Sequence, residues 1–111
     1  MTETLVDPDA IAELADTMGA DFASELVETF LGDAPDMIAA LKEALSAGDA
    51  DGYRRAAHSI KSNAQTFGAG ALADQAREME LTGLSAGAPA IPELEDIWHR
   101  TAAVLKGLPD G

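Results

Sequence analysis

The sequence contains no cysteine, few aromatic residues and few basic residues, and each shortage excludes a class of function. Without cysteine there is no thiolate nucleophile, no zinc–thiolate site and no disulfide framework. Only 7 basic residues stand against 20 acidic ones, so the net charge is −13 and nucleic acids and anionic membrane surfaces are poor candidate partners. Because the chain has neither a run of 18 apolar residues nor a leader-like start, we expect a cytoplasmic protein.

What is present favours helices. Alanine is abundant, β-branched residues are scattered, and apolar and polar residues nowhere alternate over the length of a strand. A chain of 111 residues suffices for one domain and is too short for two. We therefore expect a single all-α domain over residues 1–111, with its core at about 7–107.

Helix caps and apolar spacing divide the chain into five helical segments. Short connections between them predict an antiparallel up-down bundle preceded by a short extra N-terminal helix. The expected segments are about 8–18, about 21–47, about 51–67, one from just after Gly68 to about Gly83, and one from near Pro92 to about 106.

Two stretches bear on where these helices begin and end. Pro35 either kinks one long second helix or starts a new helix capped near Asp33. We favour one kinked helix, because the apolar pattern resumes without a polar break. The stretch Ser85–Pro89 indicates a loop before the last helix.

The third segment separates an apolar stripe from a polar face. At about 100° per residue, one narrow stripe holds Tyr53, Ala57, Ile60, Ala64 and Phe67. His58 points roughly 140° away from the centre of that stripe and so away from the core. The residues that share its face are Arg54, Arg55, Lys61, Ser62 and Gln65. On so acidic a protein this is a local cationic patch around a histidine.

This constellation suits the binding of a phosphoryl group. A neutral imidazole has a free nitrogen lone pair and can act as a nucleophile. Lys61 lies one turn further on, where its ammonium reaches a group attached to the ring, and the small Ser62 allows another protein to approach closely. The face has no carboxylate pair, glycine-rich phosphate loop or metal-ligand cluster. We interpret it as half of a catalyst that a partner completes.

The segment Ala57–Ala69 resembles the signature of histidine-containing phosphotransfer (HPt) domains. That signature has His58, an aliphatic residue at +2, Lys61 at +3, small residues at +4 to +6, an apolar residue at +9 and glycine at +10. Ser62 stands where glycine is frequent in the family. The resemblance implies a four-helix bundle with a short N-terminal helix. It also implies that His58 accepts a phosphoryl group from a receiver-domain aspartate, that Lys61 stabilises its charge, and that a second receiver takes the group.

The resemblance extends to partners and to further site residues. Gln65 lies on the face of His58, and Glu80 occupies a position close to the histidine, where we expect it to accept a hydrogen bond from the nearer ring nitrogen. The expected partners are response-regulator receivers, which bring Mg²⁺, and a hybrid sensor kinase; this chain needs no cofactor and acts as a monomeric phosphocarrier, not an enzyme. Receiver docking falls to Ser62, Arg54, Arg55 and four apolar residues that could equally close the bundle core: Ile11, Leu14, Met18 and Phe22.

Two other functions compete with this interpretation. A non-transferring module could use the same face to bind or inhibit a receiver or kinase, although it would have no need of the histidine and lysine. An enzyme would require a second catalytic group near His58, which the sequence does not supply. Asp96 and His99 have the spacing of a metal-ligand pair, but the two histidines of the chain are too few for a metal site within the bundle.

Overall fold

The computed structural model describes residues 6–107, except the side chains of Pro8 and of residues 86–88, and within this range it contains helices and no strand. The all-α prediction is confirmed. No helix among these residues has the length and apolar character needed to cross a bilayer. The elements are α1 (Pro8–Met18), α2 (Ala20–Ala47), α3 (Ala50–Thr66), α4 (Gly70–Thr82), a 3-10 turn η1 (Gly83–Ala86) and α5 (Gly87–Lys106).

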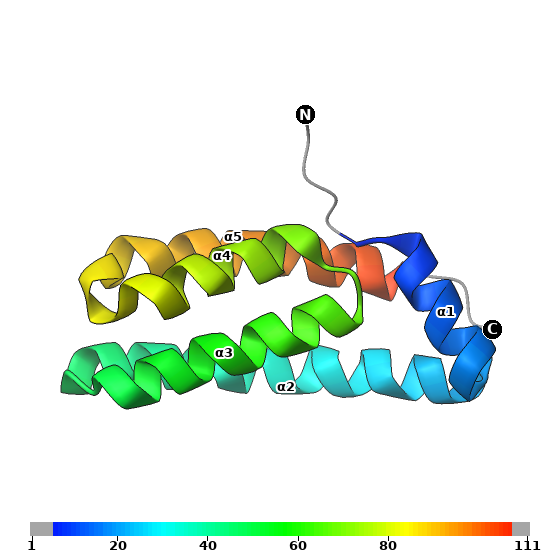
Figure 1. The fold of residues 1–111 in the computed structure, drawn as a ribbon, viewed down its shortest axis with the longest axis horizontal. Coiled ribbons are helices and arrows are strands. Elements are labelled where there is room, and N and C mark those ends of the chain that lie inside the picture. Colours follow the sequence, from blue (N-terminus) through cyan, green and yellow to red (C-terminus); the bar gives the residue numbers. More distant parts are fainter. Residues whose placement is uncertain (1–5, 108–111) are drawn as a thin grey trace.

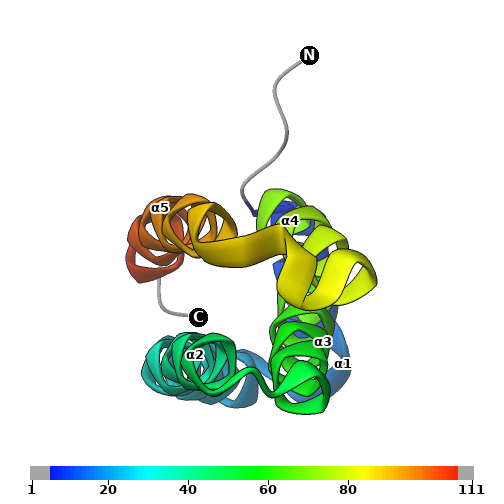
Figure 2. The ribbon, with the colours of Figure 1, turned by 90° about the vertical axis from the view of Figure 1, so that its left-hand side faces the viewer.

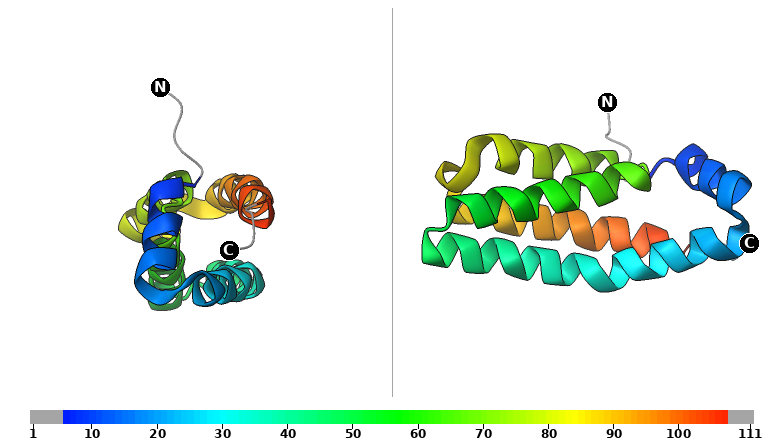
Figure 3. Two further views of the ribbon diagram at one scale, coloured as in Figure 1. Left: turned by 90° about the vertical axis from the view of Figure 1, so that its right-hand side faces the viewer. Right: turned by 60° about the horizontal axis from the view of Figure 1, so that its bottom comes forward.

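The four longer helices form an antiparallel bundle. Viewed along its length, α2, α3, α4 and α5 occupy the four corners in chain order, so that α3 and α5 lie diagonally opposite each other (Figure 2). α1 runs across one end of the bundle and packs mainly on α2 (Figures 1 and 3). The outer surfaces of α3 and α4 are therefore side by side, and α1 flanks them at one end.

α1 is fixed at its N-terminal end by a capping residue and by a contact with the end of α3. The side chain of Asp7 accepts a hydrogen bond from the amide of Asp9, and Pro8 occupies the first turn, where no amide hydrogen is required. The amide of Asp7 in turn donates to the carbonyl oxygen of Gly68 at 2.8 Å, at the end of α3. Gly68 has φ +66°, and a Cβ there would lie 2.6 Å from the Cβ of Asp7. Glycine at this position thus lets α1 approach the bundle closely.

α2 continues through Pro35 as a single helix of 28 residues. Proline lacks the amide hydrogen that would bond to the carbonyl of Leu31, which weakens the helix at this turn. Pro35 itself is exposed, while its neighbour Ala34 and, further along, Ile38 are buried in the core. Tertiary packing on both sides of the proline therefore maintains the helix, as the uninterrupted apolar pattern predicted.

The predicted loop at Ser85–Pro89 and the predicted helix start near Pro92 are wrong. The chain passes from α4 through η1 directly into α5, which begins at Gly87. The first four amides of a helix have no partner within it, so Pro89, at the third position, removes no hydrogen bond. Pro92 does remove one, but the buried Ile91 and Leu94 on either side hold this turn against the bundle.

The core is centred on Phe30 of α2. Its ring stacks on Phe67, with centroids 5.0 Å apart, and meets the edge of Trp98 of α5 at 5.1 Å. The five residues of the apolar stripe predicted for the third helix are all buried. Aromatic contacts of this kind add to the free energy gained by burial, so the rings join α2, α5 and the end of α3. The backbone of α3 is therefore fixed from its inner side.

Candidate functional site

His58 lies in the middle of α3 on the outer side of the bundle, with its side chain 58% exposed. Its neighbour Ala57 and, two positions further on, Ile60 are almost completely buried. Because these residues anchor the helix beneath the histidine, the ring is presented from a backbone with little freedom to move. Exposure and rigidity, the two properties that a reactive group needs in order to meet a partner, are thus combined here.

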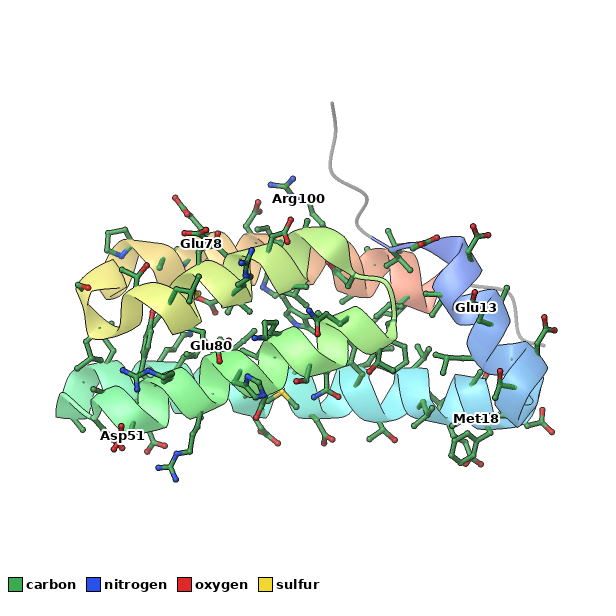
Figure 4. All side chains as sticks on the ribbon, viewed as in Figure 1. Glu13, Met18, Asp51, Glu78, Glu80 and Arg100 are labelled. Atoms are coloured by element: carbon green, nitrogen blue, oxygen red, sulfur yellow. The ribbon has the colours of Figure 1, made fainter. Side chains whose placement is uncertain are left out.

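A carboxylate from α4 joins the two residues that the sequence singled out. Oε2 of Glu80 lies 2.8 Å from Nδ1 of His58, and Oε1 of the same carboxylate lies 2.6 Å from Nζ of Lys61. Figure 4 shows Glu80 between α3 and α4. Glu80 thus occupies the position expected for it, beside the ring nitrogen nearer the backbone. Its contact with Lys61 was not expected.

The electrostatics of this triad fix the position of one proton. The hydrogen bond from Lys61 lowers the pKa of Glu80 from its ordinary value of 4.5; burial opposes this shift, and the hydrogen bond to His58 adds to it. Glu80 is therefore ionised at neutral pH, and an ionised carboxylate only accepts hydrogen bonds. Nδ1 of His58 must therefore donate, and in a neutral imidazole with its proton on Nδ1 the lone pair lies on Nε2, at the far side of the ring.

Lys61 is held beside the ring. Its side chain is only 21% exposed, and the contact with Glu80 occupies one of the three hydrogens of its ammonium. The remaining two hydrogens can still bind an anion next to the histidine. The ammonium of Lys61 balances the charge of the Glu80 carboxylate, so an arriving anion meets no excess negative charge from this pair.

Further cations surround the triad. Arg54 and Arg55, one turn before His58 on α3, are exposed as predicted. Arg77 is also exposed and lies one turn before Glu80 on α4, so it belongs to the same face. Arg77 was not among the residues predicted for the site. The signal for it is its spacing of three residues from Glu80, which places both side chains on one face of the helix.

The remaining polar residues predicted for the site lie along the same helix. Gln65 is exposed and lines an open depression together with Asp7, Gly68 and Asp74. It does not contact Glu80 within hydrogen-bond distance. Ser62 is exposed, and its carbonyl accepts a hydrogen bond from the side chain of Thr66 at 3.1 Å.

The four apolar residues proposed for docking divide into two pairs. Ile11 and Leu14 are half-buried and pack against the core. Met18 and Phe22, at the corner between α1 and α2, are 52% and 45% exposed. Figure 4 marks Met18 at the end of the bundle where α1 meets α2. Exposed apolar area suited to a partner is therefore found at this corner.

Asp96 and His99 are not grouped with a third metal-ligating side chain among the residues that the structure describes. Within residues 6–107, no group of three or more histidine, aspartate or glutamate side chains is arranged to hold a metal ion. The carboxylate of Asp96 instead pairs with the guanidinium of Arg100 one turn away.

Comparisons with known proteins agree with this geometry. The family model described as the Hpt domain matches residues 25–104, a range that includes His58, Lys61 and Glu80. The chain is also similar to the crystal structure of histidine-containing phosphotransfer protein B (HptB) from Pseudomonas aeruginosa PAO1. The TM-score is 0.84 and the identity 30%, over 95% of this chain and 94% of that chain. A search of curated proteins gave no match.

Proposed function

The chain belongs to the Hpt domain family, and on that premise we propose that it carries phosphoryl groups between receiver domains, with His58 as the acceptor. The observation that carries the proposal is the contact of 2.8 Å between Nδ1 of the exposed His58 and Glu80, which leaves Nε2 as the ring nitrogen without a partner in the protein and, in a neutral ring, with a free lone pair. A non-transferring binding module has no need of this arrangement.

The transfer step requires little chemistry from this chain. Nε2 attacks the phosphorus of an aspartyl phosphate in line, the new N–P bond forms, and the electron pair of the broken P–O bond stays on the aspartate carboxylate. The ammonium of Lys61, already placed beside the ring, binds a phosphoryl oxygen and stabilises the added negative charge. Gln65 is exposed two turns after His58 on the same helix, where it can contact the incoming partner.

The rest of the reaction centre belongs to the partner. We propose that the receiver brings Mg²⁺ and its acidic pocket, and that this chain acts as a phosphocarrier and not as an enzyme. Arg54 and Arg55 then face the acidic surface of the receiver, while Met18 and Phe22 supply the apolar part of the contact. Ser62 permits close approach beside the ring.

Transfer of label from a receiver tests the proposal. Receiver domains from the source organism are phosphorylated with ³²P-labelled acetyl phosphate, purified and mixed with the wild-type protein and with His58→Gln. Label that is acid-labile and alkali-stable is expected on the wild type and absent from the variant. His58→Gln should change the free energy of unfolding by less than about 0.5 kcal/mol, because the ring is exposed.

The same experiment identifies the competing functions. Phosphate that appears only in solution, in a His58-dependent manner, would indicate a phosphatase. Binding of a receiver without any transfer of label would indicate an interaction module that binds or inhibits its partner. Either result contradicts the proposed function.

A further inference from the structure

Leu81 of α4 is the most exposed of the large apolar side chains that the structure describes, at 70%. We infer that Leu81 is an apolar docking residue for the receiver, and that Arg77, one turn before it on α4, pairs with the receiver's acidic surface. This rests on the proposed function and adds to it a residue that distinguishes one receiver from another. Single exposed apolar residues are common on soluble proteins, so what distinguishes Leu81 is its position and the charges around it.

The position of Leu81 beside His58 follows from the contact between α3 and α4. Oε2 of Glu80 lies 2.8 Å from the imidazole, so this turn of α4 is level with His58. Leu81 is the next residue along the chain, and it points to the outer side of α4 because Leu72 and Met79, on the opposite side of the helix, are buried. The leucine therefore lies about one helix diameter, about 10–12 Å, from the ring.

Met18 and Phe22 lie further from the reacting atoms. α2 and α3 are antiparallel and joined by a short connection, so Phe22 lies about 17 residues, or about 25 Å, further along α2 than the level of His58. A typical contact of about 800 Å² per partner corresponds to a disc about 16 Å in radius. Such a contact, centred on His58, includes Leu81, whereas it has to extend toward α1 to reach Met18 and Phe22.

The arginines of this face lie on both sides of His58. Arg54 and Arg55 come one turn before it on α3, and Arg77 comes one turn before Glu80 on α4. Because α3 and α4 run in opposite directions, Arg77 is displaced from His58 toward the end of the bundle opposite to Arg54 (Figure 1). Cations thus precede and follow the ring along the bundle, and the leucine stands beside it. Contacts separated in this way fix the orientation of a partner, which in-line transfer requires.

The arginines around His58 are not neutralised by the protein's own carboxylates. None of the three lies within ion-pair distance of a carboxylate among the described residues. Elsewhere Lys42 pairs with Glu95 at 3.0 Å, and Arg100 pairs with Asp96. On a chain with 20 acidic residues, three unpaired arginines on one face leave positive charge available for an acidic partner.

A receiver fits this surface better than a second copy of the chain. In a symmetric dimer the same face of both copies would meet, so the arginines of one copy would face those of the other. Two copies, each with a net charge of −13, also repel each other. In the proposed transfer the receiver brings an acidic pocket to His58, and carboxylates at the rim of that pocket can meet the arginines. Receivers that also have an apolar depression opposite Leu81 should bind more tightly than those that lack one.

Receiver binding by variants of this face tests the inference. The receiver domain is one that labels the wild type in the transfer assay, and its affinity is measured by titration calorimetry. Leu81→Ala should weaken binding roughly 10–100-fold, because it truncates a leucine that the complex buries. Leu81→Met keeps the apolar volume and should bind within about twofold of the wild type. Arg77→Ala should weaken binding and reduce its dependence on salt.

Val104→Ala and Arg100→Ala are the matched controls. Both residues are exposed on α5, the helix diagonally opposite α3, and Arg100 is already paired with Asp96. Neither change should alter the affinity for the receiver. Circular dichroism at 222 nm checks that each variant keeps its helices, which is expected because all the substituted side chains are exposed.

Phosphorylation by a small molecule separates docking from chemistry at the ring. Potassium phosphoramidate supplies a phosphoryl group without a receiver, and its reaction with His58 is followed by intact mass. Leu81→Ala should react with phosphoramidate at the wild-type rate, while transfer from a phosphorylated receiver at low concentration should slow by the same factor as binding. A slower reaction with phosphoramidate as well would mean that Leu81 maintains the site, and would overturn the inference.

Two other results would also overturn it. One is equal affinity of Leu81→Ala and Val104→Ala for the receiver, which would leave transfer by His58 intact. The other is a wild-type dimer in sedimentation velocity that Leu81→Ala dissociates, because a second copy would then cover the leucine. A wild-type protein that no receiver labels would contradict the proposed function itself.

Discussion

Replacing Gly68 by alanine tests how closely α1 is bound to the bundle. Gly68 follows α3 with φ +66°, a conformation in which a side chain costs about 1–2 kcal/mol. A Cβ there would also lie 2.6 Å from the Cβ of Asp7 and 2.8 Å from the Cβ of Ala10, closer than carbon atoms approach each other. The start of α1 would have to move outward, which would break the hydrogen bond from the Asp7 amide to the Gly68 carbonyl, for about another 0.5–1.5 kcal/mol. With the loosened packing, Gly68→Ala should lower the free energy of unfolding by about 2–4 kcal/mol.

Gly48→Ala supplies the matched control. Gly48 has a similar φ of +69°, but a Cβ there meets no atom within 4 Å, so it measures the backbone cost alone. Both variants are unfolded in urea and followed by circular dichroism at 222 nm, while amide hydrogen exchange is measured for α1. Gly68→Ala should be the less stable variant and should show faster exchange in α1. If the two variants lose the same free energy and exchange alike, α1 is not held by this close approach and the packing argument is wrong.

Three further predictions concern the site. Lys61→Ala should slow transfer from a phosphorylated receiver roughly 10–100-fold in rapid-quench experiments, because no ammonium beside the ring then binds the phosphoryl group. Thermal unfolding should stay cooperative, and a normal transfer rate would contradict the role of Lys61 in binding the phosphoryl group. Phe22→Ala should weaken receiver binding roughly tenfold in titration calorimetry, whereas Val104→Ala, which truncates a similarly exposed apolar side chain on α5, should have no effect. Equal affinities of the two variants would show that Phe22 does not contact the receiver. The pKa of Glu80 is lower in the folded protein than its ordinary value of 4.5, so the ionised carboxylate stabilises the fold fully above that pH, and this stabilisation is lost as the pH falls through the folded-state pKa. The difference in free energy of unfolding between the wild type and Glu80→Gln, measured in urea, should therefore shrink only below about pH 4.5, and a difference independent of pH would refute the ion pair.

Local signals in the sequence were sufficient for most of the helices. The aspartate that caps α1 and the apolar stripe of α3 act within one or two turns, so they can be identified without the rest of the fold. The start of α5 could not be found in this way. Pro89 and Pro92 indicate a loop when only their neighbours are considered, and packing of Ile91 and Leu94 against the other helices overrides that preference.

For the site, too, the sequence predicts what one helix determines and does not predict the contacts between helices. Exposure of His58 follows from its angle on a single helix, so the wheel was enough. The Glu80 carboxylate lies 22 residues away on another helix, and its position beside His58 came from the family resemblance and not from periodicity. Its bond to Lys61 depends on how α3 and α4 pack together, which no pattern along one helix reveals. The sequence could not predict that Ile11 packs on the core while Met18 is exposed, because both lie at the same helical spacing and only the packing of α1 on the bundle distinguishes them.

The cluster of rings around Phe30 has a practical consequence for spectroscopy. Trp98 is the single tryptophan of the chain, is buried, and belongs to α5, the helix diagonally opposite α3. Its emission should therefore report on whether the interior is intact, and the ring lies on the opposite side of the bundle from the exposed face of α3. Intrinsic fluorescence is therefore suited to following denaturation of this protein, and a chromophore on the partner is better placed to follow complex formation.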